Sequence, residues 1–314
     1  SGKYGDVVLT IGNFDGIHLG HQKILSRVVS GAKEIQGMSM AVTFDPHPTK
    51  VLYPERNIRI LTPADEKARL MAHFGLDALC FINFTKGFAS VHPDDFIRDV
   101  LVGKIGVREV IVGHRYAFGR GKKGTTELLR RRGRKYGFKV SVVRNARLYG
   151  DVVSSSRVRS LVGRGRVCEA SLFLGRPYMI SGTVIKGAGR GGRLLGTPTA
   201  NISTQNELIP KEGVYAVKVR LGSRILGGVA NIGKNPTFSS SGSSSGNGYN
   251  IMSYEVHIFD FSEDILSRPL MLYFIDRIRD EKAFPEPEAL REQIKKDIAR
   301  GREILLAKRH PALI

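Results

Sequence analysis

The hydrophobic pattern of this chain changes once, near residue 177, and the change limits the folds available to it. From residue 6 to about 145, apolar runs of strand length alternate with amphipathic helical stretches. Strands are predicted in DVVLTIG, SMAVTFD, DALCFINF, REVIVG and KVSVVRN, and helices over residues 20–36, 63–75, 93–102 and 126–137. Buried strands separated by crossover helices are typical of a parallel sheet covered on both faces. We therefore predict an α/β domain whose ligands lie beyond the strand ends, in the loops after Ile11, Phe44 and Val112.

After residue 177 the helix periodicity disappears, and short apolar runs lie between glycines and prolines. These runs are YMISGTVI, GVYAVKVRL, ILGGVANIG, SYEVHIFDF and LMLYFIDRI. Repeated short strands of this kind predict an all-β barrel. We expect residues 239–250 to form a disordered loop between two strands, residues 286–308 an amphipathic helix on the barrel, and residues 153–176 a helical bridge. The predicted domains are residues 1–176 and 177–314.

The composition is that of a soluble globular protein, and the two cysteines favour a reducing, cytoplasmic compartment. Of the 314 residues, 41% are hydrophobic and 25% are charged. No apolar run approaches the roughly 20 residues of a membrane span, and the first residues lack the basic and apolar blocks of a signal peptide. Cys80 and Cys168 belong to no cluster that would indicate disulfides or zinc. Because the chain enters a strand without an initial methionine, we expect its natural N-terminus to be missing.

A net charge of +20 attracts polyanions and would suit a nucleic-acid-binding protein. The basic residues are scattered, however, except over residues 128–135, and no aromatic residues are interleaved with them. A basic surface that draws in small phosphate-bearing anions is the simpler interpretation.

The strongest local signal is TIGNFDGIHLGHQ, residues 10–22, where a strand ends, a glycine turn follows and a helix begins. Gly12, Gly16 and Gly20 allow the backbone to turn sharply and to approach a ligand closely. Free N–H groups at a helix start favour phosphate there. His18 and His21 share a face of the first turn, so their N–H groups can hold phosphate oxygens as charge builds up. An isolated pair of histidines would more simply be surface or capping residues, but the strand–turn–helix context favours a phosphate site.

A second phosphate-binding element is predicted in VVSSSRVR, residues 152–159. Residues 154–156 are candidates for a helix N-cap, and hydroxyls, free N–H groups and a guanidinium together can clamp β- and γ-phosphates. The alternative is a plain cap with surface arginines. With HxGH on the same chain, the two elements resemble the paired motifs of the nucleotidyltransferase superfamily, which transfers AMP and releases pyrophosphate. The resemblance identifies Arg159 as the phosphate-binding arginine.

Three segments narrow the resemblance to one family within this superfamily: GNFDGIHLGHQ, TFDPHP (43–48) and LGRPY (174–178). Together these segments resemble the bifunctional riboflavin kinase/FAD synthetases of bacteria over essentially the whole chain. The resemblance implies a Rossmann-like FMN adenylyltransferase domain followed by a Greek-key β-barrel riboflavin kinase domain with a terminal helix. The implied nucleotide contacts in the first domain are Gly12, Asn13, Phe14, Asp15, Gly16, Gly20, Ser155, Ser156 and Arg159. The implied flavin contacts are Phe44, Pro46, His47 and Pro48.

One segment departs from the family pattern. The family usually has a short acidic or amide residue where GHRYAFG (113–119) has Arg115, in a loop that faces the FMN or the adenine. Arg115 either grips the FMN phosphate or lowers activity, and the sequence leaves both open.

The second domain contains GTVIKGAGRGGRLLGTPTAN, residues 182–201. Its glycines alone favour a flexible barrel loop over a phosphate cradle. PTAN, however, resembles the riboflavin kinase signature, which implies that Thr199 and Asn201 hold the Mg²⁺ of MgATP through hard oxygen ligands. By the same resemblance, Glu255 in YEVHIFDF is the base that takes the proton of the ribityl 5′-hydroxyl. Further implied contacts are Gly187, Gly192, Arg193 and Pro198 for the nucleotide, and Asn231 and Arg268 for the flavin.

The sequence thus predicts a bifunctional enzyme that phosphorylates riboflavin to FMN and adenylylates FMN to FAD, with ATP as co-substrate, Mg²⁺ as cofactor and no membrane or nucleic-acid partner. Two alternatives remain. One is a riboflavin kinase whose adenylyltransferase module is weakened, with Arg115 as the reason. The other is a nucleic-acid-binding protein, motivated by the charge alone.

Overall fold

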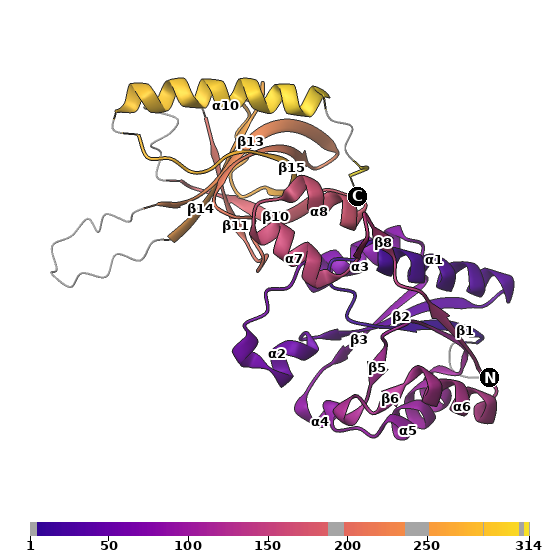
Figure 1. The fold of residues 1–314 in the computed structure, drawn as a ribbon. Helices are drawn as coiled ribbons and strands as arrows, with labels where there is room; N and C mark the ends of the chain where they lie inside the picture. The colour runs from indigo at the N-terminus through magenta and orange to yellow at the C-terminus, as the bar shows by residue number, and fades with distance from the viewer. Residues whose placement is uncertain (1–4, 188–197, 236–250, 285, 308–310, 314) are drawn as a thin grey trace. The chain divides into compact units, whose positions relative to one another are not determined.

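The computed structural model describes residues 5–187, 198–235, 251–284, 286–307 and 311–313. By its internal contacts the chain divides into two compact units, with the division between Ser155 and Ser156 (Figure 1). The helical segment predicted as a bridge falls almost entirely in the second unit. The domain boundary predicted after residue 176 stays a prediction.

The first unit is built on a five-stranded parallel sheet in the order β3-β2-β1-β4-β7. Its strands are β1 (Val7–Ile11), β2 (Met38–Asp45), β3 (Ala78–Asn83), β4 (Val107–Gly113) and β7 (Lys139–Val143). Short pairs join β5 (Ala117–Phe118) to β6 (Gly124–Thr125), and β8 (Arg147–Leu148) to β9 (Asp151–Val152). The predicted parallel sheet is confirmed. All of β1 is buried, as expected for a strand with helices on both faces.

The helices of this unit are α1 (Leu19–Glu34), α2 (Pro48–Leu52), α3 (Ala64–His73), α4 (Lys86–Ala89), α5 (Pro93–Asp95) and α6 (Thr126–Tyr136). Alternate residues of β1 point to two cores, because side chains alternate along a strand. Val7, Leu9 and Ile11 pack in the core that contains Phe96 and Leu129. Val8 packs in the other core, with the α1 residues Val28 and Ala32.

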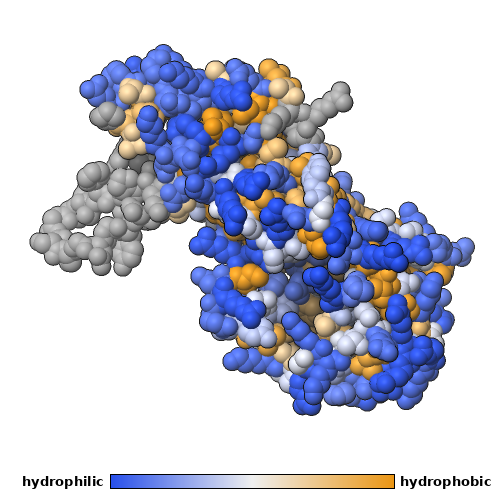
Figure 2. All heavy atoms as spheres, viewed as in Figure 1, coloured by the Kyte–Doolittle hydropathy of each residue, from blue (hydrophilic) through white to orange (hydrophobic). Residues whose placement is uncertain are grey.

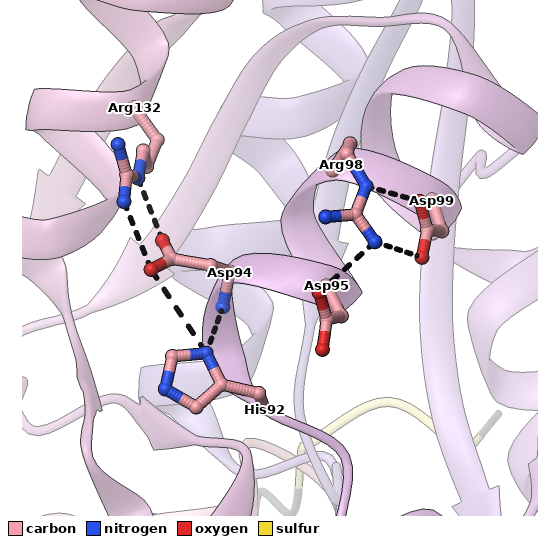
Figure 3. Close-up of polar contacts among 6 residues, drawn as sticks. All are labelled: His92, Asp94, Asp95, Arg98, Asp99 and Arg132. Atoms are coloured by element: carbon pink, nitrogen blue, oxygen red, sulfur yellow. Dashed lines mark hydrogen bonds and ion pairs between the residues drawn. The ribbon is translucent and has the colours of Figure 1, made fainter.

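The helix predicted over residues 93–102 differs in detail. The segment begins as α5 and continues as a π-type helix, η2 (Phe96–Ile105), which ends at Gly106 with φ of 77°. Two short 3₁₀ turns, η1 (Pro54–Arg56) and η3 (Arg120–Lys122), complete the unit. Asp94 of α5 accepts two hydrogen bonds from Arg132 of α6, at 2.6 and 2.9 Å, and so joins the two helices (Figure 3). The Arg132 guanidinium lowers the pKa of the Asp94 carboxyl.

The second unit is a closed antiparallel barrel in the order β10-β11-β14-β13-β12-β15. Its strands are β10 (Tyr178–Ile185), β11 (Ala200–Thr204), β12 (Gly213–Leu221), β13 (Arg224–Asn235), β14 (Ile251–Ile258) and β15 (Pro269–Arg279). Three consecutive strands, β12 to β14, lie side by side and β15 returns beside β12, which is the Greek-key order. The predicted Greek-key barrel is confirmed. The predicted loop over residues 239–250 lies outside the described residues.

Helices α7 (Ser155–Gly163) and α8 (Val167–Leu174) precede the barrel, and α10 (Pro287–Ala307) packs on β12, β13 and β15 (Figure 1). The sequence predicted an amphipathic terminal helix that packs on the barrel through its apolar residues. Ile304 is buried as expected, but so is Asp297, which accepts hydrogen bonds from Arg279 of β15 at 2.7 and 3.0 Å. None of the helices in the described part of the chain is both long enough and apolar enough to cross a membrane. Hydrophilic side chains predominate on the face shown in Figure 2.

Candidate functional sites

The segment between β1 and α1, Gly12 to Ile17, is an irregular loop that we call the phosphate loop. Phe14 and Ile17 adopt φ of 47° and 40°, values that bulky residues rarely take. Both side chains are fully buried beside Leu70 and Met71 of α3. Their burial offsets the backbone strain, so the tight turn is held by packing as well as by its glycines.

Side chains from distant segments fasten this loop. The Asp15 carboxylate accepts hydrogen bonds from the backbone N–H groups of Leu61 (2.8 Å) and Thr62 (3.2 Å). The Thr62 hydroxyl accepts from the Gly16 N–H at 3.1 Å, and the Ser155 hydroxyl donates to the Asp15 carbonyl at 2.7 Å. Asp15 and Ser155 therefore hold the loop in shape, and their predicted contact with the nucleotide stays a prediction.

His18 and His21 lie together at the start of α1. His18 is the N-cap residue, and its Nδ1 accepts from the backbone N–H of His21 at 3.3 Å. An Nδ1 that accepts a hydrogen bond leaves Nε2 as the ring's N–H donor in the neutral imidazole. The two rings stack with centroids 3.7 Å apart and planes 15° apart, and Phe14 contacts His21 edge-on at 5.2 Å. The structure thus brings the predicted pair together and holds it beside the phosphate loop.

The predicted phosphate clamp begins where α7 begins, at Ser155. Ser156 and Arg159 belong to the second compact unit. Their contribution to the adenylylation site stays a prediction.

The predicted flavin contacts follow the end of β2. His47 caps α2, with its Nδ1 accepting from the Thr49 N–H at 3.2 Å, and Pro46 and Pro48 flank it. The Phe44 ring contacts Phe84 edge-on, with centroids 5.4 Å apart.

Phe44 is one end of a run of aromatic rings that the sequence reasoning missed. Successive centroids lie 5.4 to 6.1 Å apart, and the last two rings are stacked with planes 16° apart. We call this run the aromatic cluster: Phe44, Phe84, Phe88, Phe96, Phe118 and Tyr116. Burial raises the pKa of the Tyr116 phenol. Arg115, the departure from the family pattern, is exposed and directly precedes Tyr116 in the turn after β4. Tyr116 and Phe118 belong to the GHRYAFG segment, but the other rings come from separate segments that no local motif joins to it.

In the barrel, strand register brings three predicted residues together. Glu255 of β14 pairs with Asn201 of β11 on one side and with Asn231 of β13 on the other. Residues directly opposite each other in a ladder point to the same face. Glu255 is half-buried, and its carboxylate accepts from the Ser253 hydroxyl at 3.1 Å.

The PTAN segment is attached to the same face of β14. His257, two residues after Glu255, hydrogen-bonds through Nδ1 to the Pro198 carbonyl at 2.9 Å. Gly187 approaches the Asn201 amide so closely that a Cβ there would lie 2.0 Å from Nδ2, so a larger residue would displace that side chain. The strand β11 itself was not predicted, because the glycine-rich segment before it favoured a loop.

The other site residues predicted in the barrel do not lie beside Glu255 in the part of the chain that the structure describes. Gly192 and Arg193 lie outside the described residues. The Arg268 guanidinium lies 4.0 Å from the Glu263 carboxylate. The Arg268 carbonyl accepts a hydrogen bond from the Val184 N–H of β10, and β10 is two strands away from β14 in the barrel. Its role in flavin binding stays a prediction.

A surface cavity of about 380 Å³ lies elsewhere, between α5 and α6. Its lining includes three cations, Lys123, Arg131 and Arg134, and none of the predicted site residues. It therefore adds nothing to either site.

Comparison with known proteins agrees with this two-part arrangement. Residues 2–157 match the FAD synthetase family, and residues 174–305 match the riboflavin kinase family. The bifunctional riboflavin kinase/FMN adenylyltransferase of Escherichia coli (strain K12) is 34% identical over 297 residues, covering 94% of this chain and 92% of that protein. The protein of the same name from Pseudomonas fluorescens is 35% identical over 303 residues, covering 96% and 94%.

A solved structure described as a macrolide-efflux protein from Streptococcus pneumoniae has the same fold, with a TM-score of 0.84, 30% identity and 96% coverage of both chains. The matches to the two families together cover most of both units. The chain therefore belongs to the family of bifunctional riboflavin kinase/FMN adenylyltransferases.

Proposed function

We infer that the chain phosphorylates riboflavin to FMN in the barrel and adenylylates FMN to FAD at the phosphate loop, with ATP as co-substrate of both reactions. One observation carries this assignment of sites. The chain contains both a stacked imidazole pair at a glycine turn and a carboxylate aligned between two amides, in separate units. Each arrangement suits one of the two phosphorus chemistries of the family. The matches to both families favour this reading over a single-activity kinase.

For adenylylation, a phosphate oxygen of FMN attacks the α-phosphorus of ATP, and the bond from that phosphorus to the bridging oxygen breaks to release pyrophosphate. The backbone N–H groups at the start of α1 and the Nε2–H donor of His18 suit the negative charge that builds up on the phosphate oxygens. His21, stacked on His18, is a second donor to the same oxygens. We assign Gly12, Gly16 and Gly20 to close backbone contact with the nucleotide.

The aromatic cluster supplies the flavin-binding surface that the sequence only outlined. Planar ring systems stack favourably on aromatic side chains at separations like those within the cluster. Phe44 lies at the carboxyl end of β2, the edge of a parallel sheet where ligands bind. We propose that the isoalloxazine ring packs against the cluster, and that Arg115, exposed at its end, takes the FMN phosphate or tunes that contact.

For riboflavin phosphorylation, Glu255 accepts the proton of the ribityl 5′-hydroxyl as that oxygen attacks the γ-phosphorus of ATP and ADP leaves. Asn201 lies opposite Glu255 in the ladder, and Thr199 precedes Asn201 by two residues. An amide oxygen and a hydroxyl are hard donors, so these two residues would suit Mg²⁺. Bound there, Mg²⁺ would neutralise charge on the phosphates. His257 keeps Pro198, and with it the PTAN segment, against β14.

We place the enzyme in the cytoplasm. The chain has only two cysteines, Cys80 and Cys168, which suits a reducing compartment. The net charge of +20 is explained by small anionic substrates.

The deciding experiment incubates the protein with riboflavin and MgATP and separates the flavins by chromatography. We expect FMN to appear first and FAD later, with one pyrophosphate released per FAD. Accumulation of FMN without FAD, also when FMN is supplied, would refute the adenylylation assignment. Failure to convert riboflavin would refute the kinase assignment.

A further inference from the structure

A buried lysine lies behind the phosphate loop. Lys67, on the first turn of α3, is only 6% exposed. Lysine is almost never buried to this extent unless it is paired. Its Nζ donates to the Asn13 carbonyl at 2.9 Å and lies 3.4 Å from the Thr43 hydroxyl. The sequence predicted the helix but gave no reason to expect a charged side chain on its inner face.

The contacts converge on one carbonyl group. The Thr43 hydroxyl, itself fully buried, donates to the same Asn13 carbonyl at 3.2 Å. Two side-chain donors thus pull the carbonyl of one loop residue towards α3 and β2. In a trans peptide the next N–H points the opposite way from the carbonyl. The Phe14 N–H is therefore turned away from Lys67.

The charge of Lys67 is in an unusual setting. Burial lowers the pKa of the ammonium, while the nearby carboxylates of Asp15 and Asp45 act in the opposite direction. Leaving the ammonium in this position costs desolvation free energy. The hydrogen bonds to Asn13 and Thr43 return part of it.

We propose that Lys67 is a positioning residue for adenylylation: its ammonium holds the Asn13 carbonyl and so orients the phosphate loop that receives the ATP phosphates. This rests on the proposed assignment of the loop to adenylylation. Lys67 contacts no reacting atom. It acts through the backbone, with Asp15 and Thr62 fixing the other half of the loop.

The test replaces Lys67 by methionine, which keeps the length of the side chain and removes the charge and the donor. We expect the KM for ATP in FAD formation from FMN to rise about 10- to 100-fold, because displacement of binding groups by about 1 Å has effects of that size. Riboflavin phosphorylation by the same chain should change less than about twofold and serves as an internal reference. Lys86→Met, at an exposed lysine of α4 in the same unit, is the matched control and should leave both reactions unchanged.

A second variant keeps the proposal testable if Lys67→Met does not fold. Thr43→Val removes the other donor to Asn13 while preserving shape, and we expect a rise of about 2- to 10-fold in the same KM. An unchanged KM for ATP in both variants, or a loss of kcat alone together with a lower Tm, would overturn the proposal.

The His18→Ala variant separates this outcome from failure of the site assignment. If FAD formation survives His18→Ala, the assignment of the loop is wrong. If the His18→Ala variant loses FAD formation but the Lys67→Met and Thr43→Val variants bind ATP normally, only the role of Lys67 is wrong.

Discussion

The two candidate sites are constructed in different ways. The phosphate loop of the first unit is irregular backbone, fastened by side chains that include Thr43, Thr62, Lys67 and Ser155. The kinase site of the barrel is a row of residues on three adjacent strands, with Glu255 aligned by the main-chain ladder. A loop has no repeating main-chain hydrogen bonds to define it, whereas a strand does.

This difference predicts how each site responds to substitution. In the phosphate loop a few side chains hold the backbone in place, so the loss of one of them should weaken ligand binding. In the barrel the main-chain hydrogen bonds between strands hold the backbone. There, only the loss of a reacting side chain should have a large effect. The following predictions test that contrast.

Glu255→Ala should have the largest effect. Loss of the base should lower the rate of FMN formation from riboflavin about 10²- to 10⁴-fold. Supplied FMN should still be converted to FAD at the normal rate, because the first unit is unchanged. Chromatography of the flavins after each incubation checks both statements, and normal FMN formation would show that Glu255 is not the base.

His18→Ala should have the next largest effect, in the opposite module. Removing a donor to the developing charge typically costs about 10² to 10³ in kcat. FMN should accumulate from riboflavin while FAD formation slows by that factor. Continuous measurement of pyrophosphate release gives the rate. Lys23→Ala, an exposed position on the same helix, should behave like the unchanged protein.

Asp297→Asn should affect stability rather than chemistry. The Asp297 carboxylate is 5% exposed and its partner Arg279 22% exposed, so the pair that fastens α10 to β15 is largely withdrawn from water. Removing the charge of one partner should lower the free energy of unfolding of the barrel by about 2 kcal/mol, less than for a fully buried pair. Chemical denaturation followed by circular dichroism measures this. A change in the KM for riboflavin at unchanged stability would contradict a purely structural role.

His257→Phe should have the smallest effect on activity, and it tests the difference between the phosphate loop and the barrel site most directly. The substitution removes the hydrogen bond to Pro198 but leaves β14 in its ladder. We expect the KM for MgATP in riboflavin phosphorylation to rise about 2- to 10-fold, the worth of one hydrogen bond. FAD formation from supplied FMN should not change. The increase in this KM should be smaller than the increase that Lys67→Met causes in the KM for ATP in FAD formation. A larger increase would mean that the barrel site depends on side-chain hydrogen bonds as much as the phosphate loop does.

Much of the fold was predictable because the patterns involved are local. The parallel strands are mostly apolar runs of strand length, and the barrel strands are short runs between turn residues, so both appear in the sequence. The terminal helix was found from its periodicity. β11 was missed because ANIST has a weak apolar pattern and follows a glycine-rich segment. Asp297 and Lys67 were missed because a charged residue on a helix is normally assigned to the solvent face.

The site was predictable only in part. HxGH was recognised because both histidines lie within one helical turn, and the structure places them in contact. The aromatic cluster could not be assembled from the sequence, because rings such as Phe44 and Phe118 are far apart in the chain and meet through the packing of five segments.

The sequence by itself determined the order of the two modules, the parallel and antiparallel character of their sheets, and the kinds of groups present: paired imidazoles, a carboxylate, and amide and hydroxyl oxygens. Each of these follows from a periodicity or a motif within a few residues. Only the tertiary structure decided which groups meet. Asn13 receives Lys67 from 54 residues away, and Glu255 lies between Asn201 and Asn231 because of strand register. A local pattern states which face of an element is buried, but the partner of that face depends on how the whole chain packs.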